Sequence, residues 1–270
     1  MGMNDICVYN SDRIQRLWCN CLSLKRQGER TFFYFEIEAE VSAFSAKVYD
    51  FIEKDELETL QKEIALLYKQ EKSEMAFTSF QKAVRVELKY ELGGRVSQRF
   101  YIREYKTFNY LEINDSFDQT FLPELEERIS DILINANQYD DYVSGAYGNL
   151  EKCPLIHFSN FRKYLDSDSF SFEFKYIGNA FKVLMNSGAY VEELLQFERR
   201  LERLLGDEIS VCTFAPLGEF FLLEIVRENG FSVKGSFSDT LFPQSHLSFQ
   251  ENVNMEIIED MMNEIKQCCM

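Results

Sequence analysis

The sequence predicts an α+β protein made of two tandem copies of one unit, because it repeats itself and mixes strand-like with helix-like patterns. Shifting the 270-residue chain by 137 residues aligns its apolar positions without a gap from Phe33 to Phe100, after which the offset shortens by one. Solenoid repeats recur every ~20–50 residues, so this is the duplication of a larger unit. We place an N-terminal segment at residues 1–30, copy one at 31–135, a linker at 136–167 and copy two at 168–268.

Each copy opens with two predicted strands. Apolar residues at every second position alternate with charged or polar ones, which is typical of a strand with one buried face. In copy one a second strand follows at residues 44–51. The matched apolar positions of the first strand are Phe33, Phe35 and Ile37 in copy one and Phe170, Phe172 and Phe174 in copy two.

A predicted helix follows the two strands in each copy. From Asp55 onward the apolar residues are spaced three or four apart, as on the buried face of a helix. Asp55 and Glu56 fall in the first turn, where the helix dipole favours negative charge. In copy two the counterpart runs from about Tyr190 to Leu205, and Gly206 is placed to end it.

A hairpin, another strand and a second helix complete the unit. In copy one the strands are predicted at 84–90, 96–102 and 110–113, and the helix at 122–133. Gly93-Gly94 provides the hairpin turn. The order is β-β-α-β-β-β-α, with room for one more strand near 75–80. Hairpin connections produce mostly antiparallel sheets, so the class is α+β.

The composition excludes several classes of protein. The formal net charge is −16, whereas a nucleic-acid binder needs Lys and Arg to neutralise phosphates. No apolar stretch approaches the ~18–20 residues of a membrane span, and the N-terminus shows no secretory signal. Seven irregularly spaced cysteines are typical of reduced thiols. We therefore expect a cytoplasmic protein that binds neither nucleic acid nor membrane.

The negative charge belongs to the two predicted units. Copy one holds 13 basic and 21 acidic residues, a net charge of −8, and copy two holds 8 and 17, a net charge of −9. The linker carries −1 and the N-terminal segment +2. Two acidic folded units produce a negative surface field, which favours a basic partner.

Motifs of known catalytic chemistry are missing from the sequence. It has no GxSxG elbow, no glycine-rich phosphate loop, no HExxH and no EF-hand loop. There are only two histidines, and the cysteines lack the paired CxxC spacing of a zinc site. We therefore predict that the protein is not an enzyme and uses no metal or other cofactor.

Copy one carries a more specific pattern between Phe33 and Ile129. Its parts are Phe33-Tyr34-Phe35-Glu36-Ile37, Phe44-Ser45, Asp55-Glu56-Leu57, Asn109-Tyr110-Leu111-Glu112-Ile113 and Asp118-Gln119-Thr120-Phe121-Leu122. This pattern resembles the small WapI-type immunity proteins, which neutralise the toxic tip of wall-associated contact-dependent toxins in bacteria. The resemblance implies an interaction protein without chemistry of its own, whose partner is a toxin domain. Copy two departs from the pattern after its last strand, where it has Asn252-Val253-Asn254-Met255.

Three functions stay open at this point. The first is an immunity protein or inhibitor that covers the basic cleft of an enzyme, such as a nuclease toxin. The second is an adaptor or scaffold protein of bacterial or phage defence. The third is an enzyme with a carboxylate site between the copies, which would require a cleft that holds carboxylates of raised pKa.

The candidate partner-binding residues are three acids on the first strand of copy one. Glu36, Glu38 and Glu40 share one face of that strand, because side chains alternate with period two. The alternative is that these three acids have no binding role and simply form the solvated outer face of a sheet. A second plain alternative applies to Asp118-Gln119-Thr120, whose side chains are suited to cap the helix that follows.

Overall fold

The α+β prediction is confirmed. A computed structural model describes residues 5–10, 15–104, 107–143, 154–164, 168–216, 220–239 and 244–269. In these ranges the chain forms four α-helices and two antiparallel sheets. Sheet A has seven strands in the order β1-β2-β3-β4-β11-β10-β9, and sheet B has eight in the order β12-β13-β14-β15-β8-β7-β6-β5.

The elements of the two copies correspond one to one. Copy one contains β3 (Arg30–Val41), β4 (Phe44–Glu53), α1 (Lys54–Tyr68), β5 (Glu74–Thr78), β6 (Val84–Glu91), β7 (Arg95–Arg103), β8 (Tyr110–Asp118) and α2 (Leu122–Ile134). Copy two contains β10 (Ser169–Ile177), β11 (Phe181–Tyr190), α3 (Val191–Leu205), β12 (Val211–Phe214), β13 (Phe221–Arg227), β14 (Phe231–Asp239), β15 (Gln244–Val253) and α4 (Met255–Cys269). The 137-residue offset places β4 on β11 and α1 on α3 residue for residue.

Three strands lie outside the predicted copies. β1 (Asp5–Tyr9) and β2 (Gln15–Gln27) fall in the N-terminal segment, and β9 (Leu155–Lys163) falls in the linker. β2 pairs with β3 just as β9 pairs with β10. Each repeat of the structure therefore has one strand more at its start than predicted. We call β2–β8 with α1 and α2 repeat 1, and β9–β15 with α3 and α4 repeat 2.

The repeats join edge to edge in both sheets. In sheet A, β4 pairs with β11, and Ser45 lies opposite its own counterpart Lys182. In sheet B, β8 pairs with β15, and Leu111 lies opposite its counterpart Leu247. Because equivalent strands pair with each other in antiparallel fashion, a pseudo-twofold axis relates the repeats, as in an isologous dimer.

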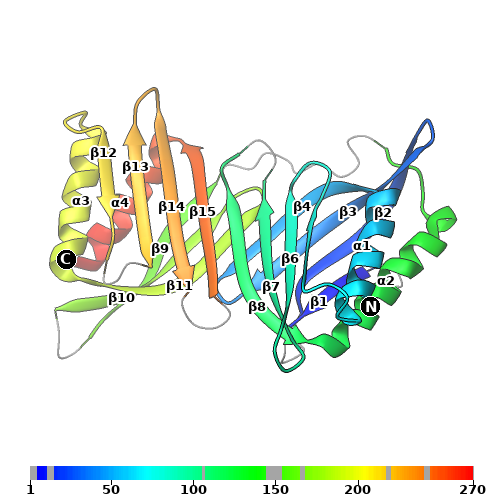
Figure 1. The fold of residues 1–270 in the computed structure, drawn as a ribbon. Coiled ribbons are helices and arrows are strands. Elements are labelled where there is room, and N and C mark those ends of the chain that lie inside the picture. Colours follow the sequence, from blue (N-terminus) through cyan, green and yellow to red (C-terminus); the bar gives the residue numbers. More distant parts are fainter. Residues whose placement is uncertain are drawn as a thin grey trace.

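The two sheets form the front and back layers of the molecule, and the helices lie at its two ends (Figure 1). Helices α1 and α2 pack together at the end of repeat 1, and α3 and α4 at the end of repeat 2 (Figure 1). Buried apolar side chains from both sheets and all four helices form one continuous core. The face of each sheet that points away from this core is its outer face.

Local sequence explains where the first helix of each repeat begins. The backbone N–H of Glu53 donates to the Glu56 carboxylate (3.0 Å), and that of Tyr190 donates to the Glu193 carboxylate (2.8 Å). These equivalent bonds satisfy N–H groups at the helix start, in the manner of a capping box. Among the described residues, no helix combines the length and apolar character needed to cross a lipid bilayer.

Candidate binding surface on the outer face of sheet A

The three predicted acids lie together on the outer face of β3. Their neighbours along the strand point into the core and are almost fully buried. Glu36 and Glu38 are half-buried, with side chains 21% and 23% exposed, and Glu40 is exposed. We call Glu36, Glu38 and Glu40 the acidic row.

A lysine of the neighbouring strand partly neutralises the acidic row. Lys47 Nζ lies 2.8 Å from Glu36 Oε2 and 2.5 Å from Glu38 Oε1, and the Tyr49 hydroxyl donates to Glu36 over 2.8 Å. Partial burial alone would lower the pKa of Lys47, but the two carboxylates outweigh it and raise that pKa above its usual value. Lys47 pairs with two of the three carboxylates, so the row keeps an excess of negative charge.

Repeat 2 does not retain this row at the equivalent positions. There Glu36, Glu38 and Glu40 correspond to Glu173, Lys175 and Ile177, and Lys47 corresponds to Leu184. The strands that carry these residues pair in the same way, since β10 pairs with β11 as β3 pairs with β4. The backbone fold therefore does not require an acidic row at this place.

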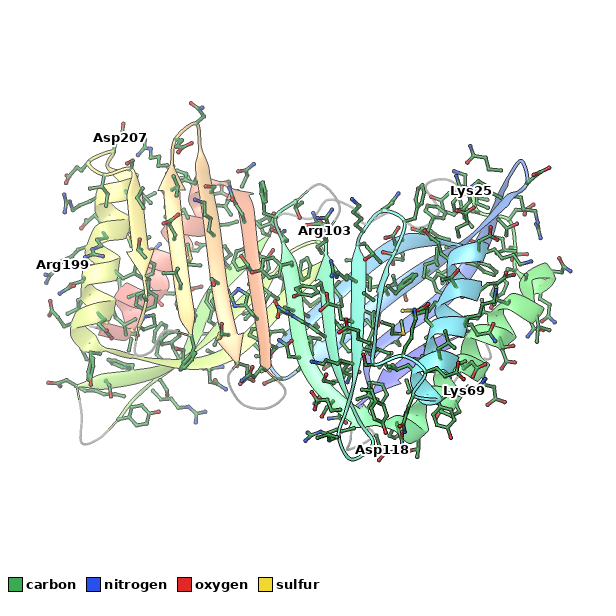
Figure 2. All side chains as sticks on the ribbon, in the orientation of Figure 1. Lys25, Lys69, Arg103, Asp118, Arg199 and Asp207 are labelled. Atoms are coloured by element: carbon green, nitrogen blue, oxygen red, sulfur yellow. The ribbon has the colours of Figure 1, made fainter. Side chains whose placement is uncertain are left out.

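An aromatic cluster that the sequence did not predict lies beside the acidic row. It consists of Tyr34, Tyr49, Phe51 and Tyr142, with ring centroids 4.8 Å apart for Tyr34–Phe51 and for Tyr34–Tyr142. Tyr142 comes from the predicted linker, which bonds to the end of β2 through Leu24. The amino group of Lys25 lies 5.7 Å from the Phe51 ring centre at the same end of the molecule (Figure 2). The linker thus covers one end of this outer face.

The Asp118-Gln119-Thr120 step begins the second helix of repeat 1. The backbone N–H of Thr120 donates to Asp118 Oδ1 (2.9 Å), and this bond lowers the pKa of Asp118. The N–H of Gln119 donates to the Gly94 carbonyl (2.8 Å), so the step is also bonded to the β6–β7 turn. Asp118 lies at the end of repeat 1 opposite Lys25 (Figure 2). These bonds agree with the capping interpretation.

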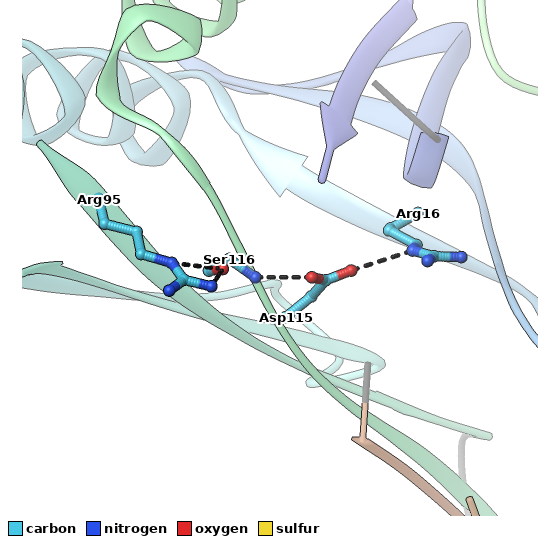
Figure 3. Close-up of polar contacts among 4 residues, drawn as sticks. All are labelled: Arg16, Arg95, Asp115 and Ser116. Atoms are coloured by element: carbon cyan, nitrogen blue, oxygen red, sulfur yellow. Dashed lines mark hydrogen bonds and ion pairs between the residues drawn. The ribbon is translucent and has the colours of Figure 1, made fainter. Parts of the chain in front are cut away.

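A buried ion pair links the two sheets in repeat 1 (Figure 3). Arg16 Nε of β2 lies 3.0 Å from Asp115 Oδ2 of β8, and the Asp115 side chain is fully buried. The other Asp115 oxygen accepts the N–H of Ser116, whose hydroxyl accepts from Arg95 (Figure 3). Every charge of this group has a partner, which is the condition under which buried charges are tolerated.

Two carboxylates meet at the junction between the repeats. The side-chain amide of the buried Asn109 donates to Glu104 (3.0 Å) and to Glu251 (3.0 Å), and the Tyr176 hydroxyl donates to Glu251 (2.7 Å). Burial, together with the nearby Glu251, raises the pKa of Glu104. Both carboxylates accept hydrogen bonds from neighbouring side chains, and these bonds join the two repeats.

Neither the metal-binding residue types in the described part of the chain nor the comparison with known proteins points to a further site. Among the described residues, no group of three or more His, Cys, Asp or Glu side chains is placed to hold a metal ion. No protein-family model, curated protein or solved structure matches the chain.

Proposed function

We propose that the protein is a non-catalytic binding protein of the cytoplasm, which covers a basic cleft of a toxin domain through the acidic row. This is the immunity function that the resemblance of copy one implies. None of the six cysteines that the structure describes forms a disulfide bond, which agrees with a reducing compartment.

One observation carries the proposal, namely the difference between equivalent outer faces of the two repeats. Repeat 1 has three acids where repeat 2 has Glu173, Lys175 and Ile177 on the same backbone arrangement. Since the fold is built without the acidic row in repeat 2, packing does not explain the row in repeat 1. A negative surface of this kind attracts a basic cleft and accelerates association with it.

The test is to replace the row with the opposite charge. The triple variant Glu36→Lys, Glu38→Lys and Glu40→Lys should bind a toxin domain encoded beside this protein at least about 100-fold more weakly, because like charges would then face each other. Affinity should be measured by calorimetry at about 50 mM and about 500 mM salt, since screening weakens surface attraction. The matched control is Glu173→Lys in repeat 2, which should leave the affinity unchanged.

A second variant tests the sign of the effect. Lys47→Leu, which copies Leu184 of repeat 2, removes the ammonium group that partly neutralises the row and should strengthen binding by about 2–5-fold. Unchanged affinity in the triple variant, or an affinity that does not depend on salt, would refute the acidic row as the binding surface. Binding without inhibition of the toxin would favour the adaptor alternative.

A further inference from the structure

A groove lies between helix α1 and the edge strand β5 of repeat 1. Its volume is about 280 Å³. One wall is β5, from Met75 to Thr78, and the other is the face of α1 that carries Asp55, Glu56, Thr59, Leu60 and Glu63. β5 is the last strand of sheet B on this side. The groove is distinct from the acidic row, which lies on sheet A.

The backbone of β5 presents hydrogen-bonding groups to this groove. Ser73 and Ser79, at the two ends of the strand, bond to Tyr90 and Val84 of β6. Because bonding direction alternates along an antiparallel strand, Ala76 and Thr78 point their N–H and C=O groups away from β6. An exposed edge of this kind is a template on which another strand can pair.

An apolar cavity lies directly beneath the groove. Its volume is about 50 Å³, and it shares Leu60, Met75 and Phe77 with the groove as lining residues. An apolar side chain that enters the groove from above would meet these three residues. Contact with these residues would remove the apolar side chain from water, which contributes ~25 cal/mol of binding free energy for each Å² of apolar surface buried.

The same groove is closed in repeat 2. Arg200, the counterpart of Glu63, donates to the carbonyl of Thr213 (3.4 Å), which is the counterpart of Ala76. Phe197 and Phe214, the counterparts of Leu60 and Phe77, stack with their ring centres 4.4 Å apart. In repeat 2, Arg200 and the stacked rings therefore cover the edge of β12. In repeat 1 the equivalent edge of β5 is accessible.

We propose that the groove of repeat 1 binds an extended, basic segment of a protein partner, which adds to sheet B as a strand beside β5. The segment would alternate basic and apolar residues. Its apolar side chains would contact Leu60, and its basic ones would lie against Asp55 and Glu56, because Glu63 is already paired with Lys72 (2.6 Å). Main-chain hydrogen bonds would provide affinity and the alternating side chains specificity, as in other strand-addition sites. This inference rests on the proposed function, because it adds a second surface for the same basic partner.

The experiment titrates the ¹⁵N-labelled full chain with the capped heptapeptide Lys-Val-Lys-Val-Lys-Val-Lys. We expect the largest amide shifts and slowed hydrogen exchange at Ala76 and Thr78, and none at Thr213. The same peptide with an N-methyl group on every peptide nitrogen keeps its charge but loses its backbone donors, and it should bind at least about tenfold more weakly. A Glu-Val peptide of equal length should not bind.

Two variants should weaken peptide binding while they keep the hydrogen bonds between β5 and β6. Ala76→Pro removes only an outward N–H, and the pair Leu60→Phe with Glu63→Arg copies repeat 2. Each should weaken the peptide at least about tenfold, whereas Thr213→Pro in repeat 2 should change nothing. Equal binding by Ala76→Pro, or shifts confined to β3, would overturn the proposal.

The two proposals fail separately. The Glu36, Glu38 and Glu40 triple variant should still bind the peptide, because its changes lie on the other sheet. A toxin neutralised by that triple variant would refute the acidic row and leave the groove standing. A peptide that gives no shifts at Ala76 and Thr78 in the wild-type chain would refute the groove and leave the acidic row standing.

Discussion

The two repeats share one backbone plan but fill their cores differently. Repeat 2 is packed with aromatic rings: Phe174 lies 5.2 Å from Phe158, 4.9 Å from Phe221 and 5.0 Å from Phe237, centre to centre. By strand register, the counterparts in repeat 1 are Ile37, Cys19, Val84 and Ile102. Repeat 1 also contains the apolar cavity of about 50 Å³, lined by Ile37 and Val84 among others.

This difference separates what the apolar pattern determines from what side-chain volume determines. The positions of apolar residues are nearly the same in both repeats, and so are the strands and helices. The choice between Phe and a smaller residue changes the packing without changing the topology. Cores tolerate such changes when the pattern is kept, but poorly filled space lowers stability.

The largest effect should come from removing a central ring of repeat 2. Phe174→Ala deletes a fully buried side chain with three aromatic neighbours and should lower the free energy of unfolding by about 3–5 kcal/mol. Urea denaturation followed by circular dichroism measures this. The matched variant Ile37→Ala enlarges a cavity in repeat 1 and should cost less, about 2–3 kcal/mol. A larger loss in repeat 1 would contradict the comparison.

The repeats also differ in how they accommodate an inward-facing acid. Asp115 of β8 and Glu251 of β15 are counterparts. Asp115 is paired with Arg16, whereas Glu251 accepts from Tyr176 and Asn109. The buried acid is therefore stabilised by a positively charged side chain in repeat 1 and by neutral hydrogen-bond donors in repeat 2.

Arg16→Met tests the charged arrangement. It leaves the buried Asp115 carboxylate without its cation and should destabilise the protein by about 3 kcal/mol, measured by thermal and urea unfolding. The double variant Arg16→Met with Asp115→Leu replaces the pair by apolar residues and should recover most of that loss. A double variant as unstable as the single one would show that the pair itself stabilises repeat 1.

Much of the fold could be predicted from the sequence, because strand and helix periodicities are local. The offset of 137 residues predicted β4, β11, α1 and α3 within a few residues. The same offset does not lead to β2 and β9, because Cys19 lies opposite Ile37 whereas Phe158 lies opposite Phe174, which is an offset of 139 residues. The pairing between repeats could not be predicted, because the choice of which strand edges meet is a tertiary property.

The candidate site was predictable only in part. Alternation along one strand placed Glu36, Glu38 and Glu40 on one face. Their contacts with Lys47 depend on the register between β3 and β4. Tyr142 reaches the same outer face through a bridge at Leu24, far away in the sequence. The groove beside β5 became visible only when the equivalent edges of the two repeats could be compared.

A single methylene group should have opposite effects in the two cores. Val84→Ile extends a side chain that lines the cavity of repeat 1 and should stabilise the protein by about 0.5–1 kcal/mol. Val233→Ile enlarges a fully buried residue in the core of repeat 2 and should destabilise it by about 1 kcal/mol, because the added methylene must displace the residues packed around it. Both are measured as shifts in the urea midpoint. Effects of the same sign would show that the two cores are equally packed.

The smallest effect concerns Glu104, because burial and the nearby Glu251 raise the pKa of its carboxyl group. The folded protein keeps this proton at pH values where the unfolded chain has lost it, so the group stabilises most below the ordinary carboxyl pKa, and that contribution is lost as the pH rises through the raised value. Glu104→Gln stays neutral and should be more stable than the wild type at about pH 8 by under ~1 kcal/mol, because Glu104 is only half-buried. The advantage should shrink as the pH falls, since Glu104 then gains its proton. Glu228→Gln, in the exposed turn between β13 and β14, is the control, and an equal pH profile for both variants would contradict the assignment.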